Sequence, residues 1–253
     1  IKRSTALDID LSKSIYVGDA AGRAKDWKKG KKKDFSCSDR RMALNVGLSF
    51  KTPEEFFLNE APAPFDLGFD PVAYRSMTHG TAESLADLMK LDQEGQEMVM
   101  LVGCPASGKS TLCKRHIVPA GYLRVNRDEL KTEQKCLQAC KAALEEKKSV
   151  VIDNTNPSPD ARLPYIKLAR QHSLKGIRAF VMNTPLDLAG HLNSVREISS
   201  KGSQPKVPIM GYNMFKSRFA EPKVEEGFTD VVHIPFIPSF DKQEDETLFM
   251  QYT

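Results

Sequence analysis

The stretch Glu97–Leu112, E-M-V-M-L-V-G-C-P-A-S-G-K-S-T-L, constrains the fold more than any other part of the chain. Residues 98–102 form an unbroken apolar run, which is typical of a strand buried on both faces of a parallel sheet. Residues 103–110 then fit the pattern G-x-x-x-x-G-K-[ST], and a helical stretch follows from Ser110. The order of strand, glycine-rich turn and helix predicts a site for the phosphates of a nucleotide.

The residues of this turn have different expected roles. Backbone N–H groups are expected to surround the phosphates, and Lys109 to reach the β- and γ-phosphate oxygens. The Ser110 hydroxyl is expected to hold Mg²⁺, and the start of the helix to add its positive dipole end. The predicted phosphate-binding loop comprises Gly103, Cys104, Pro105, Ala106, Ser107, Gly108, Lys109, Ser110 and Thr111.

The length of 253 residues and the composition fit a globular protein of one large or two small domains. No apolar run approaches the roughly 20 residues of a membrane-spanning helix, so no membrane partner is expected. Five cysteines without metal-binding or disulfide spacing favour core packing for Cys136 and Cys140, and a reducing compartment. Because the chain begins at Ile1 with neither an initiator Met nor a signal-peptide pattern, we expect it to be part of a longer protein.

The formal net charge of +4 is unevenly distributed along the chain. Residues 1–60 contain 13 Lys or Arg and 9 Asp or Glu, whereas residues 61–253 contain 24 of each. Six of those 13 basic residues lie in Lys25–Lys33, K-D-W-K-K-G-K-K-K. Such a run is as typical of a solvated loop as of a contact with the phosphates of a nucleic acid, and both interpretations stay open at this point.

Strands and helices alternate along residues 96–253, which predicts an α/β domain with a parallel sheet flanked by helices. Beyond the glycine-rich turn, strands are expected at residues 122–125, 149–152, 177–182 and 231–236. Helices are expected at residues 128–147, 159–172, 186–199 and 208–219. The polar segment 200–208 is expected to be a mobile loop.

Residues 1–60 contain too little secondary structure for a core of their own, and we interpret them as the end of a domain whose beginning is absent. Residues 61–95 are interpreted as a linker, because prolines interrupt them. The elements expected before residue 96 are a strand at 14–19, a helix at 39–47 ended by Gly47, a helix starting at 52–57 and a helix at 82–91.

Polar residues follow the predicted strands, at the edge where parallel sheets bind ligands. Asp128 opens a helix after the second strand, where an acid either caps the helix or acts as a general base for an acceptor hydroxyl. Asp153 follows the third strand, at the position of a carboxylate that helps to order Mg²⁺. The next residue is Asn154 where ATPase motors usually have Glu, and no N-K-x-D motif occurs, which disfavours motor ATPases and GTPases.

The segment His191–Arg196, H-L-N-S-V-R, precedes the predicted mobile loop. An arginine at the edge of a lid can reach the β- and γ-phosphates and stabilise the charge that develops on them. A solvent-facing arginine is equally compatible with the spacing. The sequence therefore leaves the role of Arg196 open between these two interpretations.

Taken together, these motifs resemble the bifunctional polynucleotide 5′-kinase/3′-phosphatase family of eukaryotic DNA repair. The kinase part of the resemblance rests on G-C-P-A-S-G-K-S-T, on V-N-R-D ending at Asp128, on V-I-D-N-T-N from Val151, on Asn193–Arg196, and on G-Y and E-E-G-F late in the chain. The resemblance implies that Lys109 and Ser110 bind ATP and Mg²⁺. It also implies that Asp128 is the base for the 5′-hydroxyl and that Arg196 is a lid arginine.

The first 60 residues resemble the end of the family's phosphatase domain, which has a haloacid-dehalogenase-type fold. The matching stretches are Y-V-G-D-A-A-G-R from Tyr16 and K-K-D-F-S-C-S-D-R from Lys32. By this resemblance Asp19 is a Mg²⁺ ligand. The family's D-x-D-G-T motif, which carries the nucleophilic Asp, does not occur in these 253 residues, so we expect them to lack 3′-phosphatase activity by themselves.

The sequence therefore predicts residues 1–60 as a phosphatase-domain remnant, 61–95 as a linker and 96–253 as a P-loop kinase domain. The expected activity is ATP-dependent phosphorylation of DNA 5′-hydroxyl ends in nuclear strand-break repair, within a protein that also removes 3′-phosphates. The expected partners are 5′-hydroxyl DNA ends and the absent N-terminal phosphatase segment. The alternatives are a P-loop kinase of a small metabolite and a nucleic-acid-binding subunit with a vestigial nucleotide site.

Overall fold

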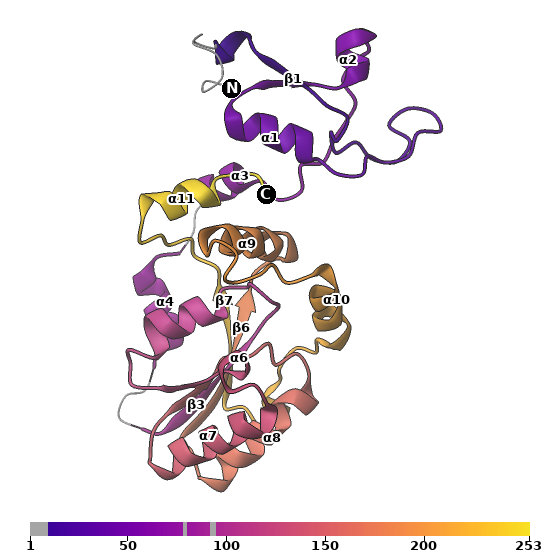
Figure 1. The fold of residues 1–253 in the computed structure, drawn as a ribbon. Coiled ribbons are helices and arrows are strands. Elements are labelled where there is room, and N and C mark those ends of the chain that lie inside the picture. The colour runs from indigo at the N-terminus through magenta and orange to yellow at the C-terminus, as the bar shows by residue number, and fades with distance from the viewer. Residues whose placement is uncertain (1–9, 78–79, 92–94) are drawn as a thin grey trace. The chain divides into compact units, whose positions relative to one another are not determined.

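The computed structural model describes residues 10–77, 80–91 and 95–253. Their fold divides into two compact units (Figure 1). The smaller unit combines the part of the chain up to Met77 with Phe240–Thr253, and the larger unit is Thr78–Ser239. The compact units therefore differ from the ranges expected in chain order, because the last 14 residues fold with the N-terminal part.

The larger unit is built on a five-stranded parallel sheet in the order β4-β5-β3-β6-β7. The apolar run of the glycine-rich motif forms the central strand β3, where every residue is buried. Its neighbours are both parallel, so that Val99 lies opposite Val151 on one side and Arg178 on the other. The strands are β3 (Glu97–Val102), β4 (Leu123–Val125), β5 (Val150–Ile152), β6 (Gly176–Asn183) and β7 (Asp230–Pro235).

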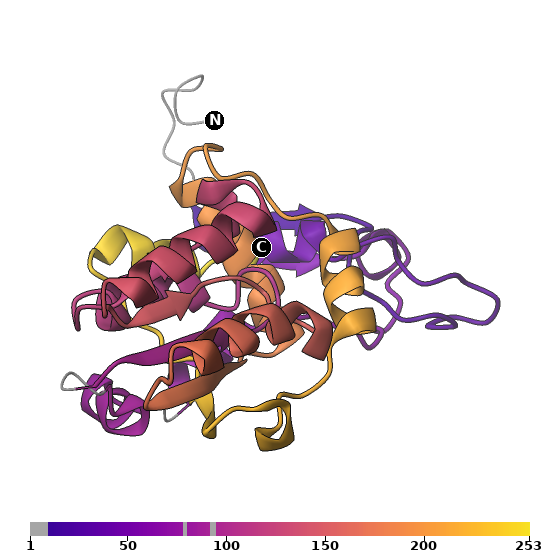
Figure 2. The same cartoon turned by 90° about the horizontal axis from the view of Figure 1, so that it is seen from below.

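Helices cover both faces of this sheet (Figures 1 and 2), as a parallel sheet requires. One face packs Met98 and Met100 against α7 and α8, which lie side by side. The other face packs Val99 and Leu101 against α4 and the helix after the glycine-rich turn. The helices of this unit are α4 (Ala82–Met89), α5 (Lys109–Leu112) with the π-helical turn η2 (Cys113–Ile117), α6 (Arg127–Leu130), α7 (Glu133–Glu145), α8 (Pro159–Gln171), α9 (Leu186–Ser199), α10 (Ile209–Arg218) and the 3₁₀ turn η3 (Val224–Glu226).

The single helix expected at residues 128–147 is wrong, because the chain forms two helices there. Lys131 ends α6 with a positive φ of 73°, and the Thr132 hydroxyl then accepts a hydrogen bond from the Lys135 N–H to start α7. A second N-cap signal inside a helical pattern therefore starts a second helix. The break leaves α6 as one short turn that carries Asp128.

The smaller unit has a two-stranded parallel sheet and short helices. The predicted Gly47 cap is confirmed, with a left-handed φ of 72° after α1. The C-terminal segment packs into this unit through Phe249, which is fully buried, and through Arg41, whose Nη1 donates to the Thr253 carbonyl at 2.6 Å. The elements are η1 (Leu11–Lys13), β1 (Ile15–Val17), α1 (Ser38–Val46), β2 (Ser49–Lys51), α2 (Pro53–Phe57), α3 (Pro71–Ser76) and α11 (Gln243–Phe249).

The described part of the chain offers no helix whose length and apolar character would suit a membrane span. All five cysteines are buried and free, and Cys136 and Cys140 pack in the core as predicted.

Candidate active site

A cavity of about 350 Å³ lies at the carboxyl ends of β3, β4 and β5 in the larger unit. Ligands bind at this edge of parallel sheets, and the sequence predicted polar residues at the same strand ends. The lining includes seven of the predicted site residues: Pro105, Ala106, Lys109, Ser110, Asp128, Asp153 and Arg196.

The glycine-rich loop has a fixed shape that its glycines permit. A Cβ atom on Gly103 would lie 2.7 Å from the Ser107 hydroxyl, and Gly108 has a φ of +91° that side chains rarely adopt. Neighbouring segments hold the loop in place, since the Thr184 hydroxyl donates to the Ser107 carbonyl at 2.9 Å and the Gly103 N–H donates to the Thr155 carbonyl at 3.2 Å. The loop is therefore preformed for a ligand.

Lys109 is 8% exposed and points back into the loop. Its Nζ donates to the carbonyl oxygens of Gly103 at 3.0 Å and Cys104 at 2.6 Å, and to the Ser107 hydroxyl at 3.2 Å. Burial lowers the pKa of Lys109 to about 8, because the charged form loses its solvation. A phosphate in the cavity would therefore meet an amine whose charge is held by three neutral oxygens.

Three other loop residues contribute little side chain to the cavity. The Cys104 side chain packs in a small apolar cluster with Ala189 and Tyr212, so this residue contributes its backbone to the loop. Ser107 is fully buried and Thr111 is exposed on α5. Of the predicted loop residues, Lys109 and Ser110 are thus the ones whose polar side chains line the cavity.

Asp153 is 1% exposed, and its two carboxylate oxygens have different surroundings. The Arg124 guanidinium donates to Oδ2 through Nε and Nη2, both at 2.7 Å. Within the described residues, the buried Oδ1 has no hydrogen-bond partner. Because a buried unpaired carboxylate oxygen is costly, Oδ1 has the character of a ligand-binding atom.

Arg124 is a site residue that sequence reasoning missed. It lies on β4, and it binds Glu129 of α6 as well as Asp153 at the end of β5. The guanidinium therefore connects the carboxylate that follows β5 to α6, the short helix that follows β4. Its position two residues before Asn126 gave no signal, because only the pairing of β4 with β5 brings it to Asp153.

Asp128 is not the N-cap of its helix, although it lies in the first turn, where an acid suits the helix dipole. The Asn126 side chain caps α6 by accepting hydrogen bonds from the N–H groups of Asp128 at 3.0 Å and Glu129 at 3.3 Å. The Asp128 carboxylate is exposed and lines the cavity, and it has no hydrogen bond or ion pair with other described residues. A free carboxylate in this place suits a proton acceptor.

Arg196 is not a solvent-facing arginine either. Its Nη2 donates to the side-chain Oδ1 of Asn193 at 2.8 Å, while its buried Nε has no partner among the residues that the structure describes. Asn193 also pairs with the backbone of Val207 in both directions, at 2.9 and 3.0 Å. Arg196 is therefore held at the cavity wall by a residue that also fastens the end of segment 200–208.

The residues present fit a phosphate ligand with Mg²⁺. The two buried side-chain polar atoms without partners in the described part of the chain, Asp153 Oδ1 and Arg196 Nε, belong to residues that line this one cavity. One is an oxygen suited to Mg²⁺ or its water, and the other is a donor suited to an anion. No group of three His, Cys, Asp or Glu side chains able to hold a metal occurs in the described residues, so the ion would need oxygens from its phosphate ligand.

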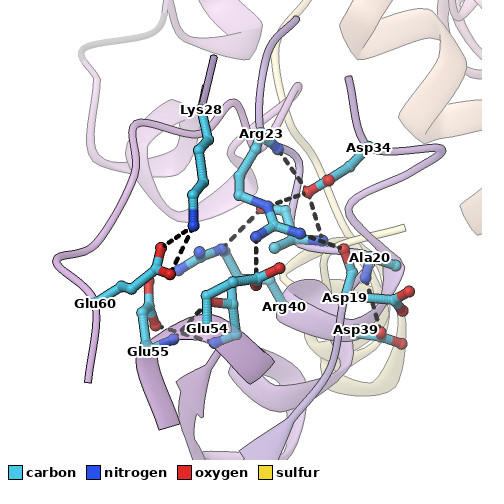
Figure 3. A network of polar contacts seen from close by, with 12 residues as sticks. Asp19, Ala20, Arg23, Lys28, Asp34, Asp39, Arg40, Glu54, Glu55 and Glu60 are labelled. Carbon is cyan, nitrogen blue, oxygen red and sulfur yellow. Dashed lines mark hydrogen bonds and ion pairs between the residues drawn. The ribbon is translucent and has the colours of Figure 1, made fainter. Parts of the chain in front are cut away.

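Asp19 lies in the smaller unit, beside Ala20 and Asp39 (Figure 3). The carboxylate is exposed and has no hydrogen bond or ion pair with other described residues. Beside it, Asp39 accepts a hydrogen bond from the Ala20 N–H at 3.0 Å, and a Cβ atom on Gly18 would collide with that carboxylate. Asp39 is a second acid at this place that the sequence argument did not single out, since it lies 20 residues further along the chain.

Two family models match separate parts of the chain. Residues 1–57 match the family described as Polynucleotide kinase 3 phosphatase, and residues 98–222 match the family described as AAA domain. Among solved structures, Kti12 of Chaetomium thermophilum in complex with ADP-AlF3 is 15% identical with a TM-score of 0.43, covering 60% of this chain and 95% of that one. A likeness this remote carries no conclusion about function.

Two curated relatives cover most of the chain. A protein of Acanthamoeba polyphaga mimivirus named as a bifunctional polynucleotide phosphatase/kinase is 40% identical over 244 residues, covering 91% of this chain and 57% of that protein. The bifunctional polynucleotide phosphatase/kinase of Schizosaccharomyces pombe is 43% identical over 229 residues, covering 90% of this chain and 52% of that protein. The chain thus spans about half the length of the curated relatives it matches.

The resemblance that the motifs indicate is therefore confirmed: the chain is a relative of the bifunctional polynucleotide phosphatase/kinases, with a phosphatase-family match at residues 1–57 and an AAA-domain match at residues 98–222.

Proposed function

We propose that this chain transfers the γ-phosphate of ATP to 5′-hydroxyl ends of DNA. The observation that carries the proposal is one cavity that contains a buried lysine, a free carboxylate and two unpaired buried atoms, Asp153 Oδ1 and Arg196 Nε. The relatives' names, which include both polynucleotide and kinase, support the same reaction and favour it over a small-metabolite kinase.

In this proposal each side chain has a separate task. The loop N–H groups and Lys109 bind the phosphates, and Arg196 donates to oxygens on which negative charge develops. Asp128 accepts the proton of the 5′-hydroxyl. Ser110 and Asp153 hold Mg²⁺, which supplies neutralisation of phosphate charge when bound.

We further propose that this activity serves DNA repair in the nucleus. The phosphatase-family stretch at residues 1–57 supports a link to the removal of 3′-phosphates. That chemistry needs a nucleophilic Asp and Mg²⁺, and Asp19 is the residue proposed as a metal ligand for it. The nucleophile of the D-x-D-G-T motif is not among these 253 residues, so the proposed 3′-phosphatase activity requires further protein.

The decisive experiment measures ATP-dependent labelling of a 5′-hydroxyl oligonucleotide in competition with candidate small metabolites. Asp128→Asn keeps the shape of the side chain and removes the base, so ATP affinity is expected to stay near that of the unsubstituted protein. Turnover is expected to fall about 10²–10⁴-fold, the usual contribution of a general base.

Asp160→Asn is the matched control, because Asp160 is an exposed acid in the first turn of α8 and does not line the cavity. Loss of ATP binding in Asp128→Asn with unchanged turnover per bound ATP would assign Asp128 a structural role. Labelling of a metabolite in preference to the oligonucleotide would favour the small-metabolite kinase. Oligonucleotide affinity without any turnover would favour a nucleic-acid-binding subunit.

A further inference from the structure

The lysine run of the smaller unit forms one exposed loop, which we call the lysine loop (residues 24–33). It carries six lysines and one aspartate in ten residues. All six side chains are exposed: Lys25, Lys28, Lys29, Lys31, Lys32 and Lys33. The function proposed for the larger unit uses none of these six lysines.

The lysine loop is closed at its base by Arg23 and Asp34 (Figure 3). The Asp34 carboxylate accepts hydrogen bonds from the Arg23 backbone N–H at 3.0 Å and from its Nε at 2.8 Å. The Asp34 N–H donates to the Arg23 carbonyl at 3.0 Å. Within the loop, two backbone hydrogen bonds of 2.9 and 2.8 Å join Asp26 to Lys31 and Lys31 to Lys28. The loop is thus a preformed structure, which lowers the entropy lost when a ligand binds to it.

Arg23 acts as the anchor of the lysine loop and not as its ligand-binding group. It is 5% exposed, and its Nη1 donates to Glu54 at 2.8 Å, so two carboxylates neutralise its charge. Its guanidinium also lies 3.8 Å from the ring centroid of Trp27. The ring of Trp27, the large apolar side chain of the loop, is therefore stacked on Arg23.

Most of the loop's positive charge is not neutralised by the protein. Lys28 binds both carboxylate oxygens of Glu60, at 2.6 and 2.9 Å, and Lys25 lies 4.0 Å from Asp26. In residues 10–77, 80–91 and 95–253, Lys29 and Lys31–Lys33 have no ion pair. Four like charges on a fixed loop repel one another, and a ligand with several negative charges relieves that repulsion.

The chemistry of the lysine loop favours a nucleic-acid backbone over other anions. Exposed lysines are flexible point charges, which suit a row of phosphates but lack the fixed donor geometry that a single bound phosphate needs. A membrane surface is less favoured, because peripheral binding relies on apolar side chains that insert, and Trp27 is stacked on Arg23.

We propose that the lysine loop binds the phosphate backbone of a polynucleotide through Lys29 and Lys31–Lys33. The proposal rests on the proposed function for the class of ligand, and it adds a binding surface in the smaller unit. It requires no base-specific contact, so the binding is expected to be independent of sequence and strongly dependent on salt.

The test measures the affinity for a 5′-phosphorylated single-stranded oligonucleotide of about 20 nucleotides, long enough for one binding site, over a range of salt concentrations without ATP. Lys29, Lys31, Lys32 and Lys33 are replaced together by Gln. We expect weaker binding and a salt dependence whose slope is smaller by roughly 0.7 for each lost contact, up to about 3 in total.

The matched control replaces four exposed lysines of the larger unit by Gln: Lys141, Lys148, Lys167 and Lys216. It changes the net charge equally, so an equal loss of affinity in the control would overturn the proposal. An unchanged slope in the loop variant would overturn it too. The proposal would also be overturned if the loop variant lost binding to phosphatidylserine vesicles but kept its oligonucleotide binding.

This experiment also separates the two proposals. The probe already carries a 5′-phosphate and no ATP is present, so binding does not depend on turnover. Failure of the kinase proposal would appear as absence of labelling in the unsubstituted protein, whereas failure of this one would appear in the binding measurements on the loop and control variants. Thermal unfolding of the loop variant checks that its fold is kept.

Discussion

Asp153 and Asp19 are the two carboxylates expected to hold metal, and the two units present them in opposite ways. Asp153 is 1% exposed, has one oxygen held by Arg124 at 2.7 Å and keeps the other unpaired. Asp19 is exposed, and its carboxylate has no partner in the described part of the chain. One carboxylate is held by an arginine, and the other has no hydrogen bond or ion pair with a described residue.

The difference follows from the layers around each acid. In the larger unit, helices pack on both faces of a five-stranded sheet, so Asp153, at the end of β5, lies at the edge of a buried apolar core. In the smaller unit a two-stranded sheet leaves large apolar side chains exposed, among them Ile15, Phe35 and Phe57. Electrostatic interactions strengthen where water is excluded. An aspartate in the larger unit therefore interacts more strongly with a bound cation than an exposed aspartate in the smaller unit does.

Lys109→Met is expected to have the largest effect, because it removes the buried lysine that lines the cavity. Turnover on a 5′-hydroxyl oligonucleotide should fall more than about 10³-fold, since no other lysine lines the cavity. Met preserves much of the buried stem, so thermal stability should change little. Substantial turnover in this variant would contradict the role of the loop in phosphate transfer.

Arg124→Leu is expected to make Asp153 resemble Asp19 by freeing its second oxygen. The Mg²⁺ concentration that supports half-maximal turnover should rise about 10–100-fold, the usual cost of losing a group that orients a metal ligand. Arg124→Lys should partly restore the normal Mg²⁺ requirement. It keeps the test interpretable if the Leu variant fails to fold.

The control for Arg124 is Arg178→Leu, which removes another partly buried arginine that pairs with an acid, Glu97, at 2.6 Å. Arg178 does not line the cavity, so its loss should lower stability without changing the Mg²⁺ requirement. If both variants lower stability and neither changes the Mg²⁺ requirement, Arg124 is a structural residue only.

The pKa of Lys109 predicts a moderate effect of pH on ATP binding. With this pKa lowered to about 8 by burial, the free protein loses the lysine charge as the pH rises above 8. Bound phosphates raise the pKa again, so binding should take up a proton at a pH of about 8.5 to 9, and affinity should weaken as the pH rises. Calorimetry in buffers of different ionisation enthalpy measures this uptake, which should disappear in Lys109→Met.

Asp19→Asn is expected to have the smallest effect. Because the carboxylate has no described partner, thermal stability should change by less than about 0.5 kcal/mol, and oligonucleotide phosphorylation should be unchanged. Asp39→Asn is the informative neighbour, since it weakens the bond to the Ala20 N–H and should cost about 1 kcal/mol. A marked fall in kinase turnover in Asp19→Asn would show that the comparison between the two acids is wrong.

The sequence predicted the local elements well where the signal was a short run of residues. The glycine-rich turn, the buried strand before it and the polar residues after three strands all occupy the expected places, because each depends on a short run of residues. The Gly47 cap is of the same kind. The one helix expected at residues 128–147 failed because two competing local signals, helical spacing and the Thr132 cap, overlap there.

Sequence alone determined which chemical groups are available: a glycine-rich loop predicted to bind phosphate, a base candidate at Asp128 and a metal candidate at Asp153. The tertiary structure decided their state. Only the pairing of β4 with β5 places Arg124 on Asp153, and only the fold of the smaller unit brings Thr253 within 2.6 Å of Arg41, 212 residues earlier. Such contacts join residues far apart in the chain, and the free energy that selects them comes from burial of whole elements, which no local pattern records.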